Sequence, residues 1–432
     1  MSRVAQRLEP VVRSALGDDL PMVVRCWDGS EFGDTQAALR ITLKRRRALR
    51  RLVWAPDELG LARAYVSGDL DVDGDLLDGL HAVQHLASPA REAVAGDHAT
   101  RAAVLRAALR LGALGPPPRP PVEEAALRGR RHSRLRDSQA IAHHYDIGNE
   151  FYRLVLGESM TYSCAYWEQK PGADFGLGDA QRAKFDLIAT KLGLAPGMRV
   201  LDVGCGWGSF AAHVAARHGV TVVGVTLSRE QAAYAERAAA DAGVGEQVEI
   251  RVQDYRDVGD GPYDAIASIG MAEHVGESML PSYSAALWEL LRPRGRLLNH
   301  AISRRPGPGR AHDAPSFIDR YVFPDGELVP LERMVGVLEG SGFEVRDVES
   351  LREHYALTLR SWVANLERNW TEAVGLSSPA RARIWRLYMA GSALAFETNR
   401  IGVNQVLAVK PDDTGGSGLP RTRKELLSGH RG

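Results

Sequence analysis

The sequence is poor in cysteine, carries no net charge and lacks a long apolar run. Its 432 residues include only three cysteines, Cys26, Cys164 and Cys205, without a C-x-x-C pair. An odd number so spaced argues against a disulfide framework and indicates a reducing compartment. Lys+Arg and Asp+Glu both total 54. The overall charge therefore gives no indication of a nucleic-acid partner, and an electrostatic partner would have to meet a local patch.

Targeting and membrane-spanning signals are missing as well. The N-terminus, residues 1–6, has no apolar core of the signal-peptide type, and no run is long and uncharged enough to cross a bilayer. We therefore predict a cytoplasmic protein that contacts the inner face of the membrane only peripherally. Hydrophobic residues make up 44% of the chain, which suffices for two domains with sizeable cores.

The most informative stretch is an apolar run, 198–203, followed by Gly204, Gly206 and Gly208 at alternate positions. This pattern predicts a buried strand, a tight turn and a helix over 209–218. Glycines without a Cβ let a ligand approach the backbone closely, and amides at a helix N-terminus can meet a polar or anionic group. Any strand–turn–helix of an α/β sheet would share part of this pattern.

The spacing separates two classes of cofactor. G-x-G-x-G differs from the G-x-G-x-x-G of dinucleotide-binding folds. The next strand ends at Thr226-Leu227-Ser228, where a nicotinamide-binding fold would usually place an acidic residue for the ribose. We therefore expect a nucleoside-type cofactor without a pyrophosphate, and S-adenosylmethionine fits best.

Strand and helix patterns alternate from residue 186 onward, which predicts a doubly wound, Rossmann-like parallel sheet with ligands at the carboxyl ends of its strands. The strands are expected at 199–203, 220–225, 248–252, 265–269 and 295–301, with helices between them, including 231–242 and 283–291. Irregular and helical insertions after the fifth strand are expected to cover the site.

Composition divides the chain into four parts. We expect a small mixed N-terminal accessory domain over 1–114, serving membrane contact or oligomerisation. A Pro-rich and basic linker over 115–137 follows, and then a catalytic domain over 138–410. The Gly-, Ser- and charge-rich tail, 411–432, is expected to be disordered.

Two basic clusters have two interpretations each. Residues 44–51 form the first cluster. The second consists of Arg128, Arg130, Arg131, Arg134 and Arg136. Each could be a solvated helix face or a patch for anionic phospholipid headgroups. The Asp-rich turn 67–75 lacks the spaced Glu of a calcium loop, and no metal site is predicted.

Several runs together resemble the cyclopropane-fatty-acyl-phospholipid synthases and related lipid methyltransferases. The most specific are Tyr162-Ser163-Cys164-Ala165-Tyr166, Glu273-His274 and His354-Tyr355. Further matches occupy 143–152, 201–208, 224–228, 253–257, 268–276 and 321–324, in family order from about 138 to 410. The resemblance implies a class I S-adenosylmethionine methyltransferase fold, and it is less sharp over the N-terminal region.

The resemblance also implies roles for individual residues. Tyr162 and Ser163 would close over S-adenosylmethionine. Asp202, Gly204 and Gly206 would meet its methionine part, Thr226, Leu227 and Gln231 its ribose, and Asp254 and Tyr255 its adenine. The resemblance also implies a site for a bicarbonate ion. The residues that match the family's positions for this ion are Cys164, Glu273, His300, Ile302 and Tyr355. Ala301 follows His300 where many relatives have Thr.

The chemistry of an alkene substrate is consistent with this set. An alkene is a poor nucleophile, so it needs a strongly electrophilic methyl donor, and methyl transfer leaves a carbocation that a dry pocket must protect from water. Aromatic faces such as Tyr166, Phe323 and Tyr355 could stabilise that cation. Glu273 and His300 follow neighbouring strands and could orient a small anion as the general base. A catalytic Cys164 thiolate is not required.

We therefore predict a methyltransferase that adds a one-carbon unit to the cis double bond of phospholipid acyl chains. The product is a methylene-branched or a cyclopropane fatty acid. The long N-terminal domain and the Ala- and Arg-rich composition resemble the branched-chain subgroup of the family, and this resemblance favours the branched product, which a partner reductase could saturate. One alternative substrate is a carrier-protein-bound or mycolate-type chain. A non-catalytic lipid-binding protein would have lost the glycine loop or Glu273, and both are present. A homo-oligomer remains open.

Overall fold

The structure is a computed structural model that describes residues 3–82, 84, 98–124, 136, 147–307 and 316–428. Their contacts form two compact units. Unit 1 comprises Met1–Ala126, Ala311–Val322 and Trp370–Leu394, and unit 2 comprises Leu127–Arg310, Phe323–Asn369 and Ala395–Gly432. This division differs from the boundaries predicted from composition, because residues 370–394 group with the N-terminal residues. Within the described ranges, no helix is both long and apolar enough to cross a membrane.

Unit 2 is built on a predominantly parallel sheet of eight strands. Along the sheet their order is β11-β12-β9-β8-β5-β6-β7, and β10 pairs with β9. The bounds are β5 Arg199–Val203, β6 Thr221–Thr226, β7 Val248–Val252, β8 Tyr263–Ile269, β9 Leu291–Arg304, β10 Val329–Pro330, β11 Glu344–Ser350 and β12 Ile401–Val409. The predicted parallel sheet is confirmed from β5 to β9. The prediction of a parallel sheet does not cover the other edge, where β12 runs antiparallel to both β9 and β11.

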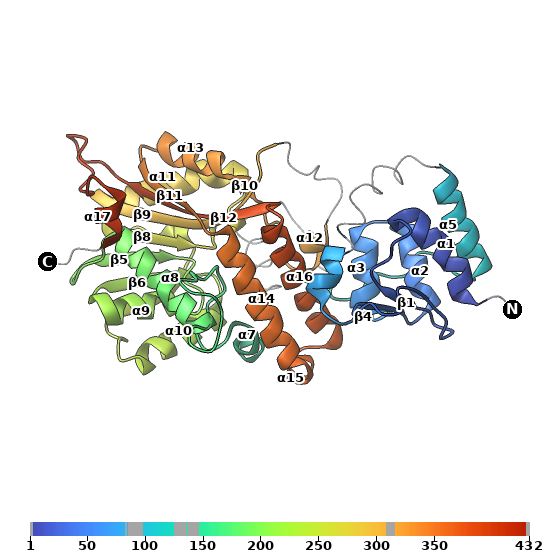
Figure 1. Cartoon of the computed structure of the whole chain (residues 1–432). Helices are drawn as coiled ribbons and strands as arrows, with labels where there is room; N and C mark the ends of the chain where they lie inside the picture. The colour runs from blue at the N-terminus through green and yellow to red at the C-terminus, as the bar shows by residue number, and fades with distance from the viewer. Residues whose placement is uncertain are drawn as a thin grey trace. The chain divides into compact units, whose positions relative to one another are not determined.

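Helices cover both faces of this sheet (Figure 1). Along β5, Val200 joins the core under one set of helices and Leu201 the core under the other, because successive strand residues point to opposite faces. The first set is α8 Leu177–Leu192, α9 Ser209–His218, α10 Arg229–Asp241 and α17 Arg423–Ser428, and the second is α11 Leu280–Leu290 and α13 Leu331–Gly340. Leu426 of α17 is buried in the first core. The prediction of a disordered tail is therefore wrong for residues 411–428.

The remaining elements of unit 2 lie in the connections. They are α7 Asn149–Leu156, α14 Arg352–Arg368 and three 3-10 turns, η1 Tyr255–Asp257, η2 Ala272–His274 and η3 Glu277–Met279. The strand order reverses direction between β5 and β8, and open α/β sheets bind ligands at the carboxyl ends of the strands beside such a point. The tips of β5 and β8 are therefore where a site is expected.

Unit 1 is a mixed unit around a four-stranded sheet of order β2-β1-β3-β4. Its strands are β1 Val23–Arg25, β2 Glu31–Gly33, β3 Arg40–Leu43 and β4 Leu70–Asp73, and its helices are α1 Val4–Leu16, α2 Arg46–Trp54, α3 Glu58–Val66, α5 His98–Arg110, α12 Phe317–Tyr321, α15 Trp370–Leu376 and most of α16 Pro379–Glu397. Arg386 of α16 donates to the Tyr65 hydroxyl and to the Val72 carbonyl. Such bonds fix a late segment of the chain to the N-terminal one.

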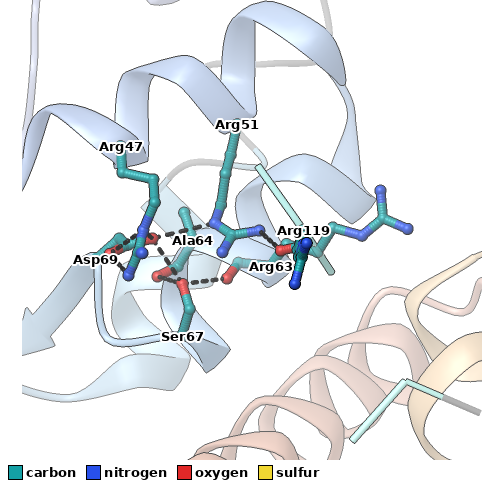
Figure 2. Close-up of polar contacts among 7 residues, drawn as sticks. All are labelled: Arg47, Arg51, Arg63, Ala64, Ser67, Asp69 and Arg119. Atoms are coloured by element: carbon teal, nitrogen blue, oxygen red, sulfur yellow. Dashed lines mark hydrogen bonds and ion pairs between the residues drawn. The ribbon is translucent and has the colours of Figure 1, made fainter. Parts of the chain in front are cut away.

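Two arginines of the first basic cluster form ion pairs inside unit 1 (Figure 2). Arg47 and Arg51 both donate to the buried carboxylate of Asp69, with nitrogen–oxygen distances of 2.8 to 3.0 Å. Arg51 is only 6% exposed, and it also donates to the Arg119 carbonyl. For Arg51, a solvated face and a lipid patch are therefore both excluded. In the second cluster Arg136 pairs with Asp325, and the other four arginines lie outside the described residues.

Candidate active site

The glycine loop after β5 is shaped to admit a ligand. Gly204 and Gly206 have φ angles of 81° and 55°, which glycine adopts at little cost. The Gly204 and Cys205 amides both donate to the Val225 carbonyl at 3.0 Å. A Cβ added at Gly206 would meet nothing within 4 Å. The open side of the loop at Gly206 is thus available for a cofactor.

The Tyr-Ser-Cys-Ala-Tyr segment lies beside this loop. The Ser209 hydroxyl, at the start of α9, donates to the Ser159 carbonyl at 2.6 Å. From α8, Gln181 donates to the Ser163 carbonyl at 3.0 Å and Lys184 to the Ser163 hydroxyl at 2.9 Å. Helix α8 therefore holds Ser163, a predicted cofactor residue, while α9 holds Ser159 just before the segment.

Lys184 is a buried charge that the sequence did not reveal, since a lysine on a helix ordinarily faces solvent. Both Lys184 and Asp202 lie inside unit 2, at 0% and 2% exposure. Burial lowers the pKa of Lys184 to about 7. Burial raises the pKa of Asp202 to about 7, opposed by the nearby Lys184 charge, and Asp202 Oδ2 has no hydrogen-bond partner among the described residues. In its protonated form Lys184 can only donate, and the Ser163 hydroxyl hydrogen is then free for another acceptor.

The end of β6 places the predicted ribose residues together. The Thr226 hydroxyl donates to Gln231 Oε1 at 2.9 Å, and both side chains are buried. Ser228 caps α10 by accepting from the Gln231 amide at 3.2 Å. Because Gln231 Oε1 accepts from Thr226, the side-chain NH₂ group of Gln231 remains as a donor. A ribose hydroxyl can accept from such a group. Leu227 lies in the same turn, half-buried.

Asp254, the predicted adenine residue, is engaged in a way the sequence did not indicate. Its carboxylate accepts from the Arg256 side chain at 2.8 and 2.5 Å and from the Arg256 amide at 3.0 Å. The adjacent Tyr255 ring lies edge-on to Tyr283, with centroids 5.5 Å apart. The ion pair fixes the turn in which both predicted adenine residues lie.

Glu273 and His300 approach the same edge of the sheet from β8 and β9. Glu273, in η2, accepts from the Ile302 amide through Oε1 at 2.7 Å, and burial raises its pKa to about 7. His300 is 2% exposed, and burial together with the Lys184 and Lys191 charges lowers its pKa to about 3. Glu273 Oε2 and His300 Nε2 are shielded from solvent, and neither has a partner in the described part of the chain.

Backbone contacts bring the other predicted anion-site residues to this edge. The Leu351 amide donates to the Val403 carbonyl at 2.9 Å, and Val403 pairs with Ile302 in the sheet. The Leu351 carbonyl accepts from the Tyr355 amide at 3.0 Å and from the Cys164 thiol at 3.7 Å. Burial raises the pKa of Cys164, so its side chain is a buried neutral thiol.

An aromatic cluster adjoins these residues. The Tyr162 ring lies 5.3 Å from Trp362 and 6.4 Å from Phe323, between centroids. Tyr355 lies 6.0 Å from Trp362 and 4.7 Å from Phe396. Tyr162, Phe323, Tyr355, Trp362 and Phe396 therefore form a largely buried aromatic cluster, of the apolar kind that suits an acyl chain and a cation.

Two other residues that the sequence singled out, Tyr166 and His274, are placed differently relative to this cluster. Tyr166 stacks on His354, with ring centroids 4.9 Å apart, and within the described part of the chain no ring contact joins it to the aromatic cluster. His274, predicted to be structural, packs edge-on against Phe323 at 5.5 Å, and burial lowers its pKa to about 4. His143 and His144 lie outside the described residues.

The fold and the glycine loop define the class of S-adenosylmethionine-dependent methyltransferases. The structure resembles cyclopropane synthase MmaA2 of Mycobacterium tuberculosis, with a TM-score of 0.59 and 33% identity over 64% of this chain and 98% of that one. Mycolic acid cyclopropane synthase CmaA1, complexed with SAH and CTAB, gives a TM-score of 0.58 and 34% identity over 63% and 97%.

Sequence comparison gives the family. The mycolic acid cyclopropane synthetase model matches residues 132–406, and the chain belongs to this family. It is 43% identical over 93% of both chains to a probable fatty acid methyltransferase of Mycobacterium tuberculosis. A probable fatty acid methyltransferase of Pseudomonas putida is 37% identical over 97% of this chain and 99% of its own. The protein is therefore an S-adenosylmethionine-dependent lipid methyltransferase of the cyclopropane synthase type.

Proposed function

We propose that the protein adds a one-carbon unit to the cis double bond of an unsaturated acyl chain carried by a phospholipid. The observation that carries this proposal is the pair of shielded polar atoms, Glu273 Oε2 and His300 Nε2, without partners among the described residues. Both atoms lie at the same edge of the sheet. Tyr355, whose ring belongs to the aromatic cluster, reaches this edge through its backbone contacts. An acyl chain offers the two polar atoms no hydrogen bond, so a small polar species fits beside it.

The residues fit a small anion such as bicarbonate. With its pKa near 7, Glu273 is in part protonated at neutral pH, and a protonated carboxyl can donate to an anion. His300 and the Tyr355 hydroxyl would be further contacts, while the Ile302 amide orients Glu273 through its 2.7 Å bond. A bicarbonate ion held there would supply a proton acceptor.

The chain's own residues would then perform three tasks. S-adenosylmethionine supplies an electrophilic methyl group, whose transfer to the alkene leaves a cation on the acyl chain. The glycine loop, Ser163 and Gln231 would orient that donor, and the aromatic cluster would exclude water and stabilise the cation. Proton loss from the new methyl group then closes a ring. After a hydride shift, the same loss gives a methylene branch.

The names of the relatives support a fatty acyl substrate. Two relatives that match nearly the whole chain are named probable fatty acid methyltransferases. Cyclopropane mycolic acid synthase 1, by contrast, matches only 62% of this chain. This favours a fatty acyl substrate over a mycolate-type one. We further propose peripheral contact with the membrane that holds the phospholipid, and a methylene-branched product that a separate reductase would saturate.

Incubation with S-adenosylmethionine and either oleoyl-phospholipid vesicles or carrier-bound oleate tests these points. Released fatty acids heavier by one CH₂ are expected from the vesicles. Uptake of hydrogen to a branched saturated acid identifies the methylene product, and resistance to hydrogenation identifies the ring. Product from carrier-bound oleate alone would overturn the phospholipid substrate, and no product from either would overturn the alkene chemistry.

A further inference from the structure

A buried polar chain runs from His300 away from the proposed anion position. His300 of β9 and Gln405 of β12 are direct partners in the sheet, and Gln405 Nε2 lies 3.3 Å from His300 Nδ1. Gln405 Oε1 accepts from Lys191 Nζ at 2.9 Å. Gln405 and Lys191 are both 0% exposed. Two strands and helix α8 therefore hold the three side chains in fixed positions.

Lys191 determines which end of the Gln405 amide faces His300. An ammonium group has three donors and no acceptor, so only the amide oxygen can face it. The NH₂ end must then face His300, and because that end only donates, Nδ1 must be the acceptor. A hydrogen bond from Lys191 to Glu349 at 2.5 Å and an ion pair with Asp347 at 3.4 Å balance the charge of Lys191 and keep it in place.

An accepting Nδ1 fixes the position of the proton on the imidazole ring. The charges near His300 are those of Lys184 and Lys191, and both disfavour the imidazolium, as does burial. A neutral imidazole carries one N–H, and if Nδ1 accepts, that N–H is on Nε2. Nε2 is the shielded atom that has no partner in the described ranges.

We propose that Lys191 and Gln405 are positioning residues that lock His300 in the neutral Nε2–H tautomer. His300 then presents a hydrogen-bond donor, and not a base, to an acceptor atom in the site. This inference deepens the proposed function and rests on it for the placement of His300 in the active site. It also assigns proton removal to a group other than His300.

Nitrogen NMR of the full-length protein labelled with ¹⁵N-histidine tests the tautomer, because protonated and unprotonated ring nitrogens have well-separated shifts. His354 supplies an internal reference, since its Nδ1 accepts from the Trp167 backbone amide at 2.8 Å. Loss of one signal set in His300→Asn assigns the His300 resonances. An unprotonated Nδ1 that persists through neutral pH is expected. An unprotonated Nε2, or two protonated nitrogens, would overturn the proposal.

Gln405→Glu tests the cause of the locking. A carboxylate accepts both from Lys191 and from the ring, so the proton should move to Nδ1, and kcat should fall at least tenfold with KM within twofold. Asn404→Asp is the matched control: it makes the same chemical change one residue away, where the native side chain contacts Ser303 at 2.8 Å, and should keep the wild-type His300 spectrum. A wild-type spectrum in Gln405→Glu would overturn the role of Gln405. If no form methylates acyl chains, the proposed function fails, while the spectra still decide the tautomer.

Discussion

Two buried clusters of charged side chains, one in each unit, differ in how fully their polar atoms are hydrogen-bonded. In unit 1, both oxygens of Asp69 accept hydrogen bonds from arginine, and Ser67 adds another (Figure 2). In unit 2, Glu273 and His300 each keep one shielded polar atom without a partner among the described residues. A buried polar atom costs free energy unless it is hydrogen-bonded. The satisfied cluster is therefore explained by the fold alone, whereas the incomplete one calls for a ligand.

Removing the charge of Glu273 should give the largest effect. Glu273→Gln keeps the size of the side chain but can neither ionise nor pass on a proton, so we expect kcat for acyl methylation to fall by about 10²–10⁴-fold, while stability at neutral pH is kept or raised because no carboxylate is buried. Glu332→Gln, on the exposed face of α13, is the control and should keep wild-type activity. Wild-type kcat in Glu273→Gln would remove this residue from the chemistry.

The satisfied cluster should respond through stability. Asp69→Asn leaves Arg47 and Arg51 without their counter-charge, so we expect a loss of about 3–5 kcal/mol in the free energy of unfolding of unit 1. Denaturant unfolding of the full chain measures it. Asp73→Asn, at an exposed position of β4, should change stability by less than about 0.5 kcal/mol. Equal losses in the two variants would contradict the structural role of Asp69.

The pH dependence of stability should have opposite signs at the two sites. Burial raises the pKa of Glu273 from 4.5 to about 7, so its contribution is present below pH 4.5 and is lost as the pH rises through 7. At Asp69, burial acts to raise the pKa, but hydrogen bonds from Arg47, Arg51 and Ser67 outweigh it, and the pKa lies below 3.8. Its contribution is therefore present above pH 3.8 and is lost at lower pH.

These contributions appear as differences from Glu273→Gln and Asp69→Asn in unfolding measured across pH. For Glu273 we expect a change on the order of 1–3 kcal/mol between pH 4.5 and 8. The same sign of pH dependence for both carboxylates would contradict the contrast between the two clusters.

A smaller effect separates ligand contact from backbone strain. Gly206 and Gly197 have φ angles of 55° and 82°, and a Cβ at either would meet nothing within 4 Å. Substitution by Ala should therefore destabilise both variants similarly, by about 1–2 kcal/mol. Only Gly206→Ala should weaken S-adenosylmethionine binding, at least tenfold by calorimetry, because of the two glycines only Gly206 belongs to the loop that we propose to hold the cofactor. Equal affinities in the two variants would move the cofactor away from this loop.

Local patterns predicted the centre of the fold well. The bounds of β5, α9 and β7 agree with those expected from sequence, because the buried apolar run of β5, the alternating Val and Ile of β7 and the glycines at both ends of α9 carry their signals within a few residues. The same holds for the glycine loop. Glu273 and Ile302, two of the residues predicted to hold the anion, are joined by a hydrogen bond although they are far apart in sequence.

Features that depend on distant partners were missed. Lys184 and Lys191 look like ordinary surface lysines of a helix, and their burial depends on Ser163, Gln405 and Glu349, which come from elsewhere in the chain. The arginines of α2 suggested a charged surface, because nothing near them in sequence reveals the buried Asp69. The strands β11 and β12 were likewise not predicted, although their pairing supplies Gln405.

Methyl-deuterated S-adenosylmethionine, given to the protein with oleoyl-phospholipid vesicles, tests the central claim most directly. Mass analysis of the released fatty acids should find the label in the acyl chain with one deuterium lost. It should find none when the vesicles contain only saturated chains, and far less with Glu273→Gln. Label in the headgroup, or label in saturated chains, would contradict methyl transfer to a double bond.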